Sequence, residues 1–350
     1  MNANDETSNL SPISKEMLLQ RLSAALSARQ VMLSPDHTQA LRLFNGFYEG
    51  CPGLVVDLYG STLVVANHAR PPESLENYLA IVFDFYHLAL PWLTSGLLKR
   101  RHAPDPAQRR GIIIFGEALT SIITEHGVHY ALDLTLNQDS SFYLDTRNLR
   151  KYLIENMAGK SVLNCFAYTG ALGIAALTGG ARKVIQTDLN KAALKLAQQS
   201  SQLNTCPGYM ETLPMDFFKV VANFKQHKVL FDCVILDPPL YSSTPQGTVD
   251  LLHNWLRLIN KVRPLVAHEG KLIATNNALF LPGSAVMQTL DTLQTTGFVQ
   301  LEQLIPVPED LTGFPQTVYD QQPVDPRPFN HPTKIAVLQI TRKDQARATY

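Results

Sequence analysis

The sequence contains few cysteines and no paired cysteine motif. Its four cysteines are widely spaced among 350 residues: Cys51, Cys165, Cys206 and Cys233. None belongs to a CxxC pair or stands near a histidine at the spacing of metal ligands, which argues against a disulfide framework and a zinc site. The pattern predicts reduced, mostly buried thiols in a cytoplasmic protein without a bound metal.

Long apolar runs and an excess of charge are also lacking. The most apolar stretch, residues 81–93, is interrupted by Asp84, His87 and Pro91 and falls short of the roughly 20 apolar residues of a membrane span. The N-terminal segment MNANDETSNLSPISKE is polar, unlike a secretory signal. Thirty basic and thirty acidic residues cancel, so any attraction to nucleic acid has to come from a local patch.

The pattern of predicted strands and helices changes near residue 146. Residues 1–12 are expected to be disordered, and apolar residues at helical spacing predict an amphipathic helix within 14–33. Short β-like runs then surround one helical stretch, and from 146 onward strands alternate with helices, which predicts a doubly wound parallel α/β sheet. The expected organisation is a tail and helix (1–40), a small α+β domain (41–145) and an α/β domain (146–350), with a loop or lid at 306–332.

One apolar strand runs into an acid and two prolines, in VILDPPLYSS at residues 234–243. Pro238 and Pro239 remove backbone donors and end the strand, which leaves Asp237 at its carboxyl end. In open parallel α/β sheets, ligands bind at that edge. Taken alone, these residues are explained equally well by a buried strand with a rigid exit and a surface acid.

Three further strands of the predicted sheet end in a glycine turn or an acid. Gly170 would let the backbone approach a ligand, and Asp188 is placed to accept both hydroxyls of a ribose. Asp216 could accept from an adenine amino group while Phe217 packs on the base. The alternatives are a plain turn at Gly170 and helix caps at Asp188 or Asn190 and at Asp216. Together the strand ends predict an adenosine-bearing ligand, and the lack of a GxxxxGK[ST] loop favours S-adenosylmethionine over a dinucleotide.

Taken in order, six segments resemble one enzyme family, the bacterial 23S ribosomal RNA methyltransferases that modify cytosine C5 or guanine N7. The similarity covers roughly residues 41–280 and lies in RLFNGFYEGCPGLVVDLYG, SSFYLDTRNLR, VLNCFAYTGALGIAAL, TDLN, MDFF and LDPPLY. It implies a Rossmann-like, doubly wound, seven-stranded methyltransferase sheet with a smaller N-terminal α+β domain, S-adenosylmethionine as cofactor and ribosomal RNA as partner. The cofactor-binding residues that it implies are Tyr143, Asp145, Arg147, Asn164, Phe166, Tyr168, Gly170, Asp188, Leu189, Asp216, Phe217 and Asp237.

Two departures from that family stand out. Its members usually have a Lys-Thr-Gly-like turn before the aromatic pair, whereas this chain has Asp139, Ser140 and Ser141. The cytosine-modifying members also carry an N-terminal PUA domain that binds RNA, for which the residues before 41 leave no room.

The residues after the fifth strand decide between the two methylation chemistries. Methylation of cytosine C5 requires a thiolate that adds to C6. In the cytosine-modifying enzymes that cysteine stands in a Ser-Cys-Ser-like triplet, whereas this chain has Thr275, Asn276 and Asn277, which resembles the Ser-Asn-Asn triplet of the guanine-N7 branch. We therefore predict methylation of a base nitrogen, with Asp237, Tyr241 and Asn276 shaping the acceptor pocket. A polar turn is the alternative explanation of the two asparagines.

A basic run, LLKRRHAPDPAQRR, is the candidate RNA contact. Lys99, Arg100 and Arg101 are expected to bind phosphates there, and a solvated loop is the alternative. The neutral total charge and the missing PUA domain favour a small-molecule methyltransferase as the second hypothesis, and a non-catalytic binding scaffold is the third. The sequence leaves the target nucleotide and the oligomeric state open.

Overall fold

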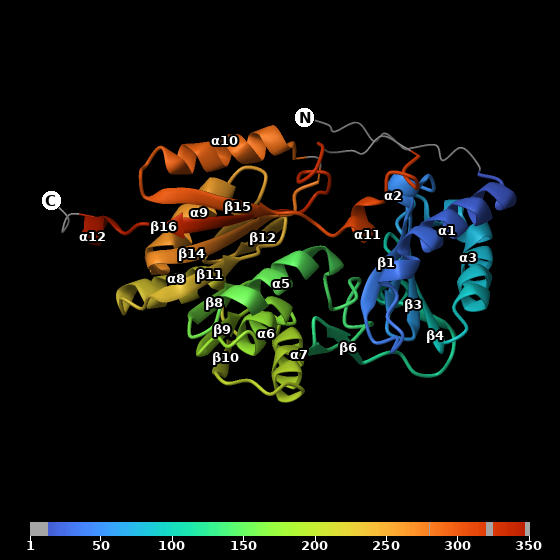
Figure 1. Cartoon of the computed structure of the whole chain (residues 1–350), viewed down its shortest axis with the longest axis horizontal. Helices are drawn as coiled ribbons and strands as arrows, with labels where there is room; N and C mark the ends of the chain where they lie inside the picture. The colour runs from blue at the N-terminus through green and yellow to red at the C-terminus, as the bar shows by residue number, and fades with distance from the viewer. Residues whose placement is uncertain (1–12, 280, 320–324, 347–350) are drawn as a thin grey trace. The chain divides into compact units, whose positions relative to one another are not determined.

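The computed structural model describes residues 13–279, 281–319 and 325–346 (Figure 1). The predicted disorder of residues 1–12 lies outside this part of the chain. The protein divides into two compact units, each described here by itself. The first unit comprises residues 1–125, 132–144 and 309–322, and the second comprises 126–131, 145–308 and 323–350.

The first unit contains a five-stranded sheet in the order β1-β2-β3-β4-β5. Its strands are β1 (Ala40–Asn45), β2 (Leu54–Tyr59), β3 (Thr62–Asn67), β4 (Ser95–Arg100) and β5 (Ile112–Phe115). Only the pair β3 and β4 is parallel, so β1, β3 and β4 all run in the same direction. β4 contradicts the solvated loop that was the alternative explanation of the basic run, because residues 97–100 of that run form a largely buried strand.

Two helices cover one face of this sheet, α1 (Lys15–Arg29) and α3 (Glu76–Ala89). Ser14 caps α1 by accepting a hydrogen bond from the amide of Met17 at 3.2 Å. Leu18 and Leu22 of α1 and Phe83 of α3 are buried in the core of the first unit. The N-terminal helix is therefore part of this unit's core. The shorter elements are η1 (Gln30–Met32), α2 (Gly46–Glu49), η2 (Pro72–Leu75), α4 (Pro106–Arg110), β6 (Ile122–Glu125) and α11 (Glu309–Thr312).

Residues 309–319, expected to belong to a loop or lid, are part of the first unit and pack there around a buried ion pair. Arg29 and Glu49 are both fully buried, with Nη1 and Oε1 2.8 Å apart. The second Arg29 nitrogen, Nη2, donates to the carbonyl of Asp310 at 2.7 Å, and the Thr317 hydroxyl donates to Glu49 at 2.5 Å. Asn45 adds a bond to the carbonyl of Leu311 at 2.7 Å. These bonds hold the returning segment in place.

The second unit contains a seven-stranded sheet in the order β10-β9-β8-β11-β14-β16-β15. Its strands are β8 (Ser161–Cys165), β9 (Lys183–Thr187), β10 (Tyr209–Leu213), β11 (Phe231–Leu236), β14 (Val266–Asn276), β15 (Val299–Ile305) and β16 (Lys334–Ile340). The first five strands of that order are parallel, and β16 is antiparallel to both of its neighbours. This arrangement confirms the predicted Rossmann-like methyltransferase sheet.

Helices cover both faces of this sheet (Figure 1). α5 (Arg147–Asn156) and α6 (Ala171–Thr178) pack on one face, and α8 (Phe217–Gln226), α9 (Trp255–Val262) and α10 (Gly283–Gln294) pack on the other. Because both faces are covered, the central strands are apolar and buried almost throughout. The remaining elements are β7 (Val128–Ala131), η3 (Leu144–Thr146), α7 (Lys191–Gln202), β12 (Tyr241–Thr244), β13 (Gly247–Asp250), η4 (Arg263–Leu265) and α12 (Lys343–Ala346).

Candidate functional site

The carboxyl edge of the parallel strands begins with a tight turn after β8. Phe166, Tyr168 and Gly170 all have positive φ angles, of 58°, 51° and 78°. A Cβ atom at Gly170 would lie 2.4 Å from the Cβ of Ala197 and 2.5 Å from Nε2 of Gln186, so only glycine fits this position. The turn brings backbone to the edge and then starts α6.

α6 differs from the next two helices at this edge in how it begins. Asn190 caps α7 by accepting from the amides of Ala192 and Ala193, each at 3.1 Å. Asp216 caps α8 by accepting from Phe218 at 2.8 Å and Lys219 at 3.2 Å, both through Oδ1. The N-terminus of α6 has no side-chain cap among the described residues. Its first amides therefore remain available to an anionic ligand group, such as the carboxylate of S-adenosylmethionine.

Asp188 joins the turns that follow β8 and β9. Its Oδ2 accepts from the amide of Tyr168 and its Oδ1 from the amide of Asn190, each at 2.8 Å. It does not cap α7, because Asn190 does so. Each carboxylate oxygen keeps a second lone pair, which suits the two hydroxyls of a ribose. The side chain of Leu189 is 60 % exposed, which offers an apolar surface beside that position.

Two aromatic residues and a buried asparagine lie near the turn that follows β8. The ring centroids of Phe166 and Phe217 are 4.6 Å apart, and Phe217 is only 5 % exposed. Asn164 is buried and donates to Gln186 at 2.9 Å, and Gln186 in turn donates to the carbonyl of Gly170 at 3.2 Å. The Asn164 amide thus stabilises the glycine turn indirectly, through its hydrogen bond to Gln186. Oδ1 of Asn164 has no hydrogen-bond partner in the described part of the chain.

At the end of β11, Asp237 is held by its neighbour on β14 and lies near a second acid. The hydroxyl of Thr275 donates to Oδ1 of Asp237. Burial raises the pKa of Asp237 to about 6; the bond from Thr275 opposes this rise and the charge of Asp145 adds to it. Asp145, in η3, accepts from the hydroxyl of Thr333 at 2.5 Å. Asp145 thus lies near enough to Asp237 for its charge to act on that carboxyl.

The two asparagines after β14 differ in what their side chains do. Asn276 is fully buried; its Nδ2 donates to the carbonyl of Leu251 at 3.2 Å and its Oδ1 accepts from the amide of Ala278 at 3.0 Å. Its polar groups are engaged within the unit, so it positions the turn. Oδ1 of Asn277 is buried without a partner among the described residues. The sequence prediction named Asn276 for the acceptor pocket, whereas the oxygen without a partner belongs to its neighbour Asn277.

The remaining predicted site residues lie in three different settings. Tyr241 opens β12, opposite Asp250 in the hairpin, and is 65 % exposed. Arg147 is half-buried at the start of α5. Tyr143 belongs to the first unit, where its hydroxyl donates to Oδ2 of Asp139 at 3.1 Å. It is therefore not among the residues that the second unit brings together.

The three predicted RNA-binding cations are all engaged inside the first unit. Lys99 is only 1 % exposed, and its ammonium donates to the carbonyls of Asn137 at 3.0 Å and Asp139 at 2.9 Å. Burial lowers the pKa of Lys99 to about 8. Arg101 pairs with Asp139 at 2.7 Å, and Arg100 pairs with Glu76 at 2.6 Å. The prediction of a phosphate contact at Lys99 is therefore wrong, because β4 carries this side chain into the interior.

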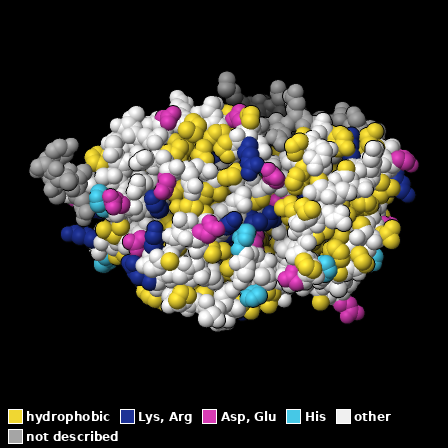
Figure 2. Space-filling view, viewed as in Figure 1, with side chains coloured by type: hydrophobic (Ala, Val, Ile, Leu, Met, Phe, Trp, Pro, Cys, Tyr) yellow, Lys and Arg dark blue, Asp and Glu magenta, His cyan; other side chains and the backbone are white. Residues whose placement is uncertain are grey.

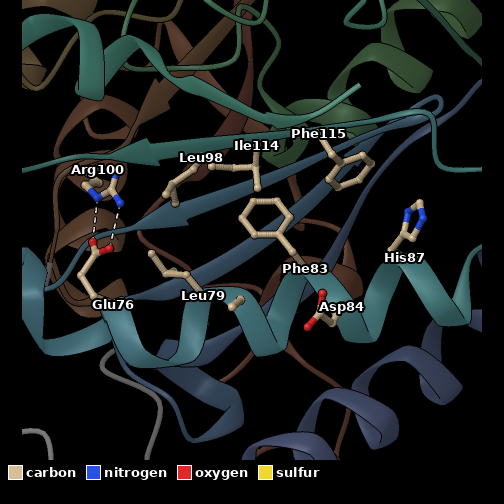
Figure 3. A pocket seen from close by; sticks show the side chains of 10 residues that line it. Glu76, Leu79, Phe83, Asp84, His87, Leu98, Arg100, Ile114 and Phe115 are labelled. Carbon is tan, nitrogen blue, oxygen red and sulfur yellow. Dashed lines mark hydrogen bonds and ion pairs between the residues drawn. The ribbon is translucent and has the colours of Figure 1, made fainter. Parts of the chain in front are cut away.

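Arg100 and Glu76 stand at one end of a hollow of about 480 Å³ between α3 and the strands β4 and β5 (Figure 3). Apolar side chains, including Phe83 and Phe115, line most of its length, and His87 stands at the other end (Figure 3). Of its two acids, Glu76 is paired with Arg100 and Asp84 stands on α3, and no glycine turn is among the lining residues. On the face shown in Figure 2, basic and acidic side chains are interspersed.

The described residues contain no group of three or more His, Cys, Asp or Glu side chains arranged to hold a metal ion. No helix in this part of the chain has the length and apolarity that crossing a bilayer requires.

Known proteins resemble the chain in sequence and in fold. A family model described as S-adenosylmethionine-dependent methyltransferase matches residues 44–310. The chain is 27 % identical over 281 residues to the ribosomal RNA large subunit methyltransferase I of Photobacterium profundum, covering 79 % of this chain and 70 % of that protein. For the protein of the same name from Aliivibrio fischeri the identity is 27 % over 317 residues, covering 88 % and 79 %.

A solved structure supports the same fold. The methyltransferase SMU.776, in complex with SAH, superposes with a TM-score of 0.78 at 20 % identity and covers 94 % of this chain and 82 % of its own. The family match spans most of the chain, and the carboxyl edge has a glycine turn, the acid Asp188 and a helix N-terminus without a side-chain cap among the described residues. The chain therefore belongs to the S-adenosylmethionine-dependent methyltransferases, and S-adenosylmethionine is its cofactor.

Proposed function

We propose that this enzyme methylates a base of large-subunit ribosomal RNA at a ring nitrogen, with guanine N7 as the favoured atom. The relatives named above support the RNA class, since they are ribosomal RNA large subunit methyltransferases. The observation that carries the choice of atom is the chemistry at the ends of β11 and β14. Oxygen acceptors stand there, on Asp237 and Asn277, and no thiol does.

None of the four cysteines is placed to act as a nucleophile. Cys165 and Cys233 lie fully buried in β8 and β11, and Cys51 is buried in the first unit. Burial raises the pKa of each of these thiols, and also that of the half-buried Cys206. Since the thiolate is the reactive form, a mechanism that needs addition to cytosine C6 has no group to perform it.

Guanine suits the two oxygen acceptors. Its Watson–Crick edge presents N–H donors at N1 and N2, and Asp237 and Oδ1 of Asn277 would accept from them. N7 lies on the opposite edge of the base and is left facing the methyl donor. The exposed ring of Tyr241 would pack on the face of a flipped-out base.

The cofactor supplies a methyl group on a positively charged sulfur. The uncapped amides of α6 and the Asp188 carboxylate would hold it at the edge of the sheet, so that transfer becomes a matter of alignment. Guanine N7 has no proton to lose, and the positive charge moves onto the purine during transfer. An ionised Asp237 beside the base would stabilise that charge as it develops.

We expect Asp188→Ala to weaken binding of S-adenosylmethionine by about 1 to 3 kcal/mol, because the variant loses the ribose acceptor. Asp188→Asn is the matched control: its one oxygen still accepts from a backbone amide, so the turn is better preserved while the charge is lost. Isothermal titration calorimetry measures both affinities. Unchanged affinity in the alanine variant would remove Asp188 from the cofactor site.

Replacing each cysteine by alanine, one at a time, is expected to leave kcat within about threefold of the parent enzyme. The buried positions will lose stability, on the order of 1 kcal/mol, because each replacement leaves a small cavity. Turnover is measured below the melting temperature of each variant. A well-folded variant without turnover would restore the cytosine-C5 mechanism.

The experiment that tests the substrate class is transfer of a labelled methyl group. The enzyme is incubated with labelled S-adenosylmethionine and an unmodified transcript of large-subunit ribosomal RNA, and in parallel with a small-metabolite extract. We expect label in the RNA. Label confined to a small molecule would contradict the proposal and favour the small-molecule alternative.

A further inference from the structure

One edge of the sheet in the first unit collects cationic and aromatic side chains. β1, β3 and β4 run in the same direction, so their carboxyl ends lie at one edge, and the register sets Asn67 beside Arg100. We call the residues that follow these three strand ends the edge patch. It consists of Phe47 after β1, His68 and Arg70 after β3, and Arg101 and His102 after β4.

Backbone hydrogen bonds fix the turn that carries half of the edge patch. The side chain of Asn67 accepts from the amide of Ala69 at 2.9 Å and donates to the carbonyl of Pro72 at 2.8 Å. The amide of Arg101 donates to the carbonyl of Asn67 at 2.9 Å, and the amide of His68 donates to the carbonyl of Gly53 at 2.7 Å. The ends of β3 and β4 are thus tied to each other.

The charged groups of the edge patch lie close enough to influence one another. Burial lowers the pKa of His68 to about 3, and the charges of Arg101, Arg42 and His102 lower it further. Burial also lowers the pKa of His102, together with the charges of Arg70 and Arg101. Both imidazoles are therefore neutral near pH 7, and the two arginines of the patch carry its positive charge.

Of the two arginines in the edge patch, one is balanced by an acid: Asp139 pairs with Arg101 at 2.7 Å. Arg70 is exposed at the end of β3. The edge therefore suits an anionic partner, and phosphate oxygens complement arginine groups in particular.

Phe47 distinguishes this edge from a simple anion site. Its ring is 43 % exposed and meets the His68 ring edge-on, with the centroids 5.8 Å apart and the planes at 78°. A large aromatic ring held open to solvent beside arginines is the arrangement by which proteins bind single-stranded nucleic acid, with bases stacked on the ring and phosphates on the cations.

We propose that the edge patch docks a single-stranded segment of the ribosomal RNA substrate, with phosphates on Arg70 and Arg101 and one base stacked on Phe47. This inference rests on the proposed function for its choice of partner. Of the three cations in the sequence prediction it retains only Arg101, whose ion pair with Asp139 leaves its side chain 22 % exposed, and it adds Phe47 and Arg70. It also gives a chain of zero net charge a local means of holding RNA.

The test measures binding of a large-subunit ribosomal RNA transcript over a series of salt concentrations, without cofactor. Arg70→Gln should weaken binding severalfold and lower the slope of log K against log[salt] by about 0.7, the value for one phosphate contact on a single strand. Phe47→Ala should weaken binding between about fivefold and a hundredfold with little change in slope. Lys15→Gln, an exposed charge-matched change on α1, is the control and should alter neither quantity.

Further readouts separate the possible outcomes. The affinity for S-adenosylmethionine, the melting temperature and kcat at saturating RNA should match the parent enzyme in Phe47→Ala and Arg70→Gln, while KM for RNA rises. Parental affinity for the transcript and a parental salt slope in both variants would overturn the proposal. It would also be overturned if the two variants lost binding to anionic lipid vesicles and still bound the transcript as the parent does. A parent enzyme that binds the transcript through this patch yet methylates no RNA would contradict the proposed function and leave the patch standing.

Discussion

Replacing Asp237 by asparagine is expected to lower kcat by at least a hundredfold while leaving RNA affinity nearly unchanged. The carboxylate acts on the charge that develops during methyl transfer, so its loss appears in the transition state rather than in binding. Asparagine keeps an oxygen that accepts from Thr275, so the turn is preserved. Single-turnover rates and RNA binding by the same variant separate the two effects.

The same substitution should stabilise the protein above pH 6. Burial raises the pKa of Asp237 to about 6 from its ordinary value of 3.8, so the native state holds this proton more tightly than the unfolded chain does. The stability that the neutral form contributes is present below about pH 4 and is lost as the pH rises through about 6. Since one pKa unit corresponds to about 1.4 kcal/mol, Asp237→Asn should gain roughly 2 to 3 kcal/mol at pH 8 and almost nothing at pH 4.

Asp232, at the opposite end of β11, provides a matched control of opposite sign. It accepts from the amide of Ser161 at 2.7 Å and from its hydroxyl at 2.8 Å, and its pKa is lowered by these bonds despite burial, with help from Arg182. Asp232→Asn should therefore lose stability near pH 7 and retain kcat. A stability loss in Asp237→Asn at pH 8, or parental turnover, would contradict the role assigned to Asp237.

Removing Glu49 should cost about 3 to 5 kcal/mol of stability, the largest loss that we expect from a single substitution outside the second unit. Glu49→Ala leaves the fully buried guanidinium of Arg29 without its partner, and removing one member of a buried pair has this cost. It also removes the acceptor for Thr317 and for the amide of Asn45 at 2.8 Å, so the returning segment 309–319 is released as well.

Glu76→Ala is the control within the same unit. Glu76 also pairs with an arginine, Arg100, at 2.6 Å, but its side chain is 37 % exposed, so we expect a loss of no more than about 1 kcal/mol. Denaturant unfolding followed by a probe in the first unit measures both variants. Similar small losses in the two would show that the Arg29–Glu49 pair does not hold the segment.

Local patterns were sufficient to predict the second unit's sheet but not the details around it. Alternating apolar strands and helices, together with acids at the strand ends, predicted the parallel sheet and its carboxyl edge. The hairpin of β12 and β13 was missed because both strands are short and consist mostly of polar residues, a composition that is typical of a loop. β4 was missed because a basic segment such as the one at its end is typical of an exposed surface. The structure instead buries Lys99, whose ammonium donates to two backbone carbonyls.

Long-range contacts account for the remaining differences. Residues 309–319 read as a proline-rich loop, and their attachment depends on Glu49, which is 268 positions from Thr317 in the chain. No pattern within the segment indicates that partner. Likewise, Asn276 and Asn277 are equivalent by residue type, and only the carbonyl of Leu251 and the amide of Ala278 decide which of the two side chains is hydrogen-bonded within the unit.

The identity of the methylated nucleoside tests the central claim most directly. An unmodified transcript of large-subunit ribosomal RNA is methylated in vitro, digested to nucleosides and analysed by mass spectrometry against standards. Because the acceptor edge has Asp237 and Asn277 but no thiol, we predict 7-methylguanosine as the product. Recovery of 5-methylcytidine instead would contradict this account and would require one of the four cysteines to act as a nucleophile.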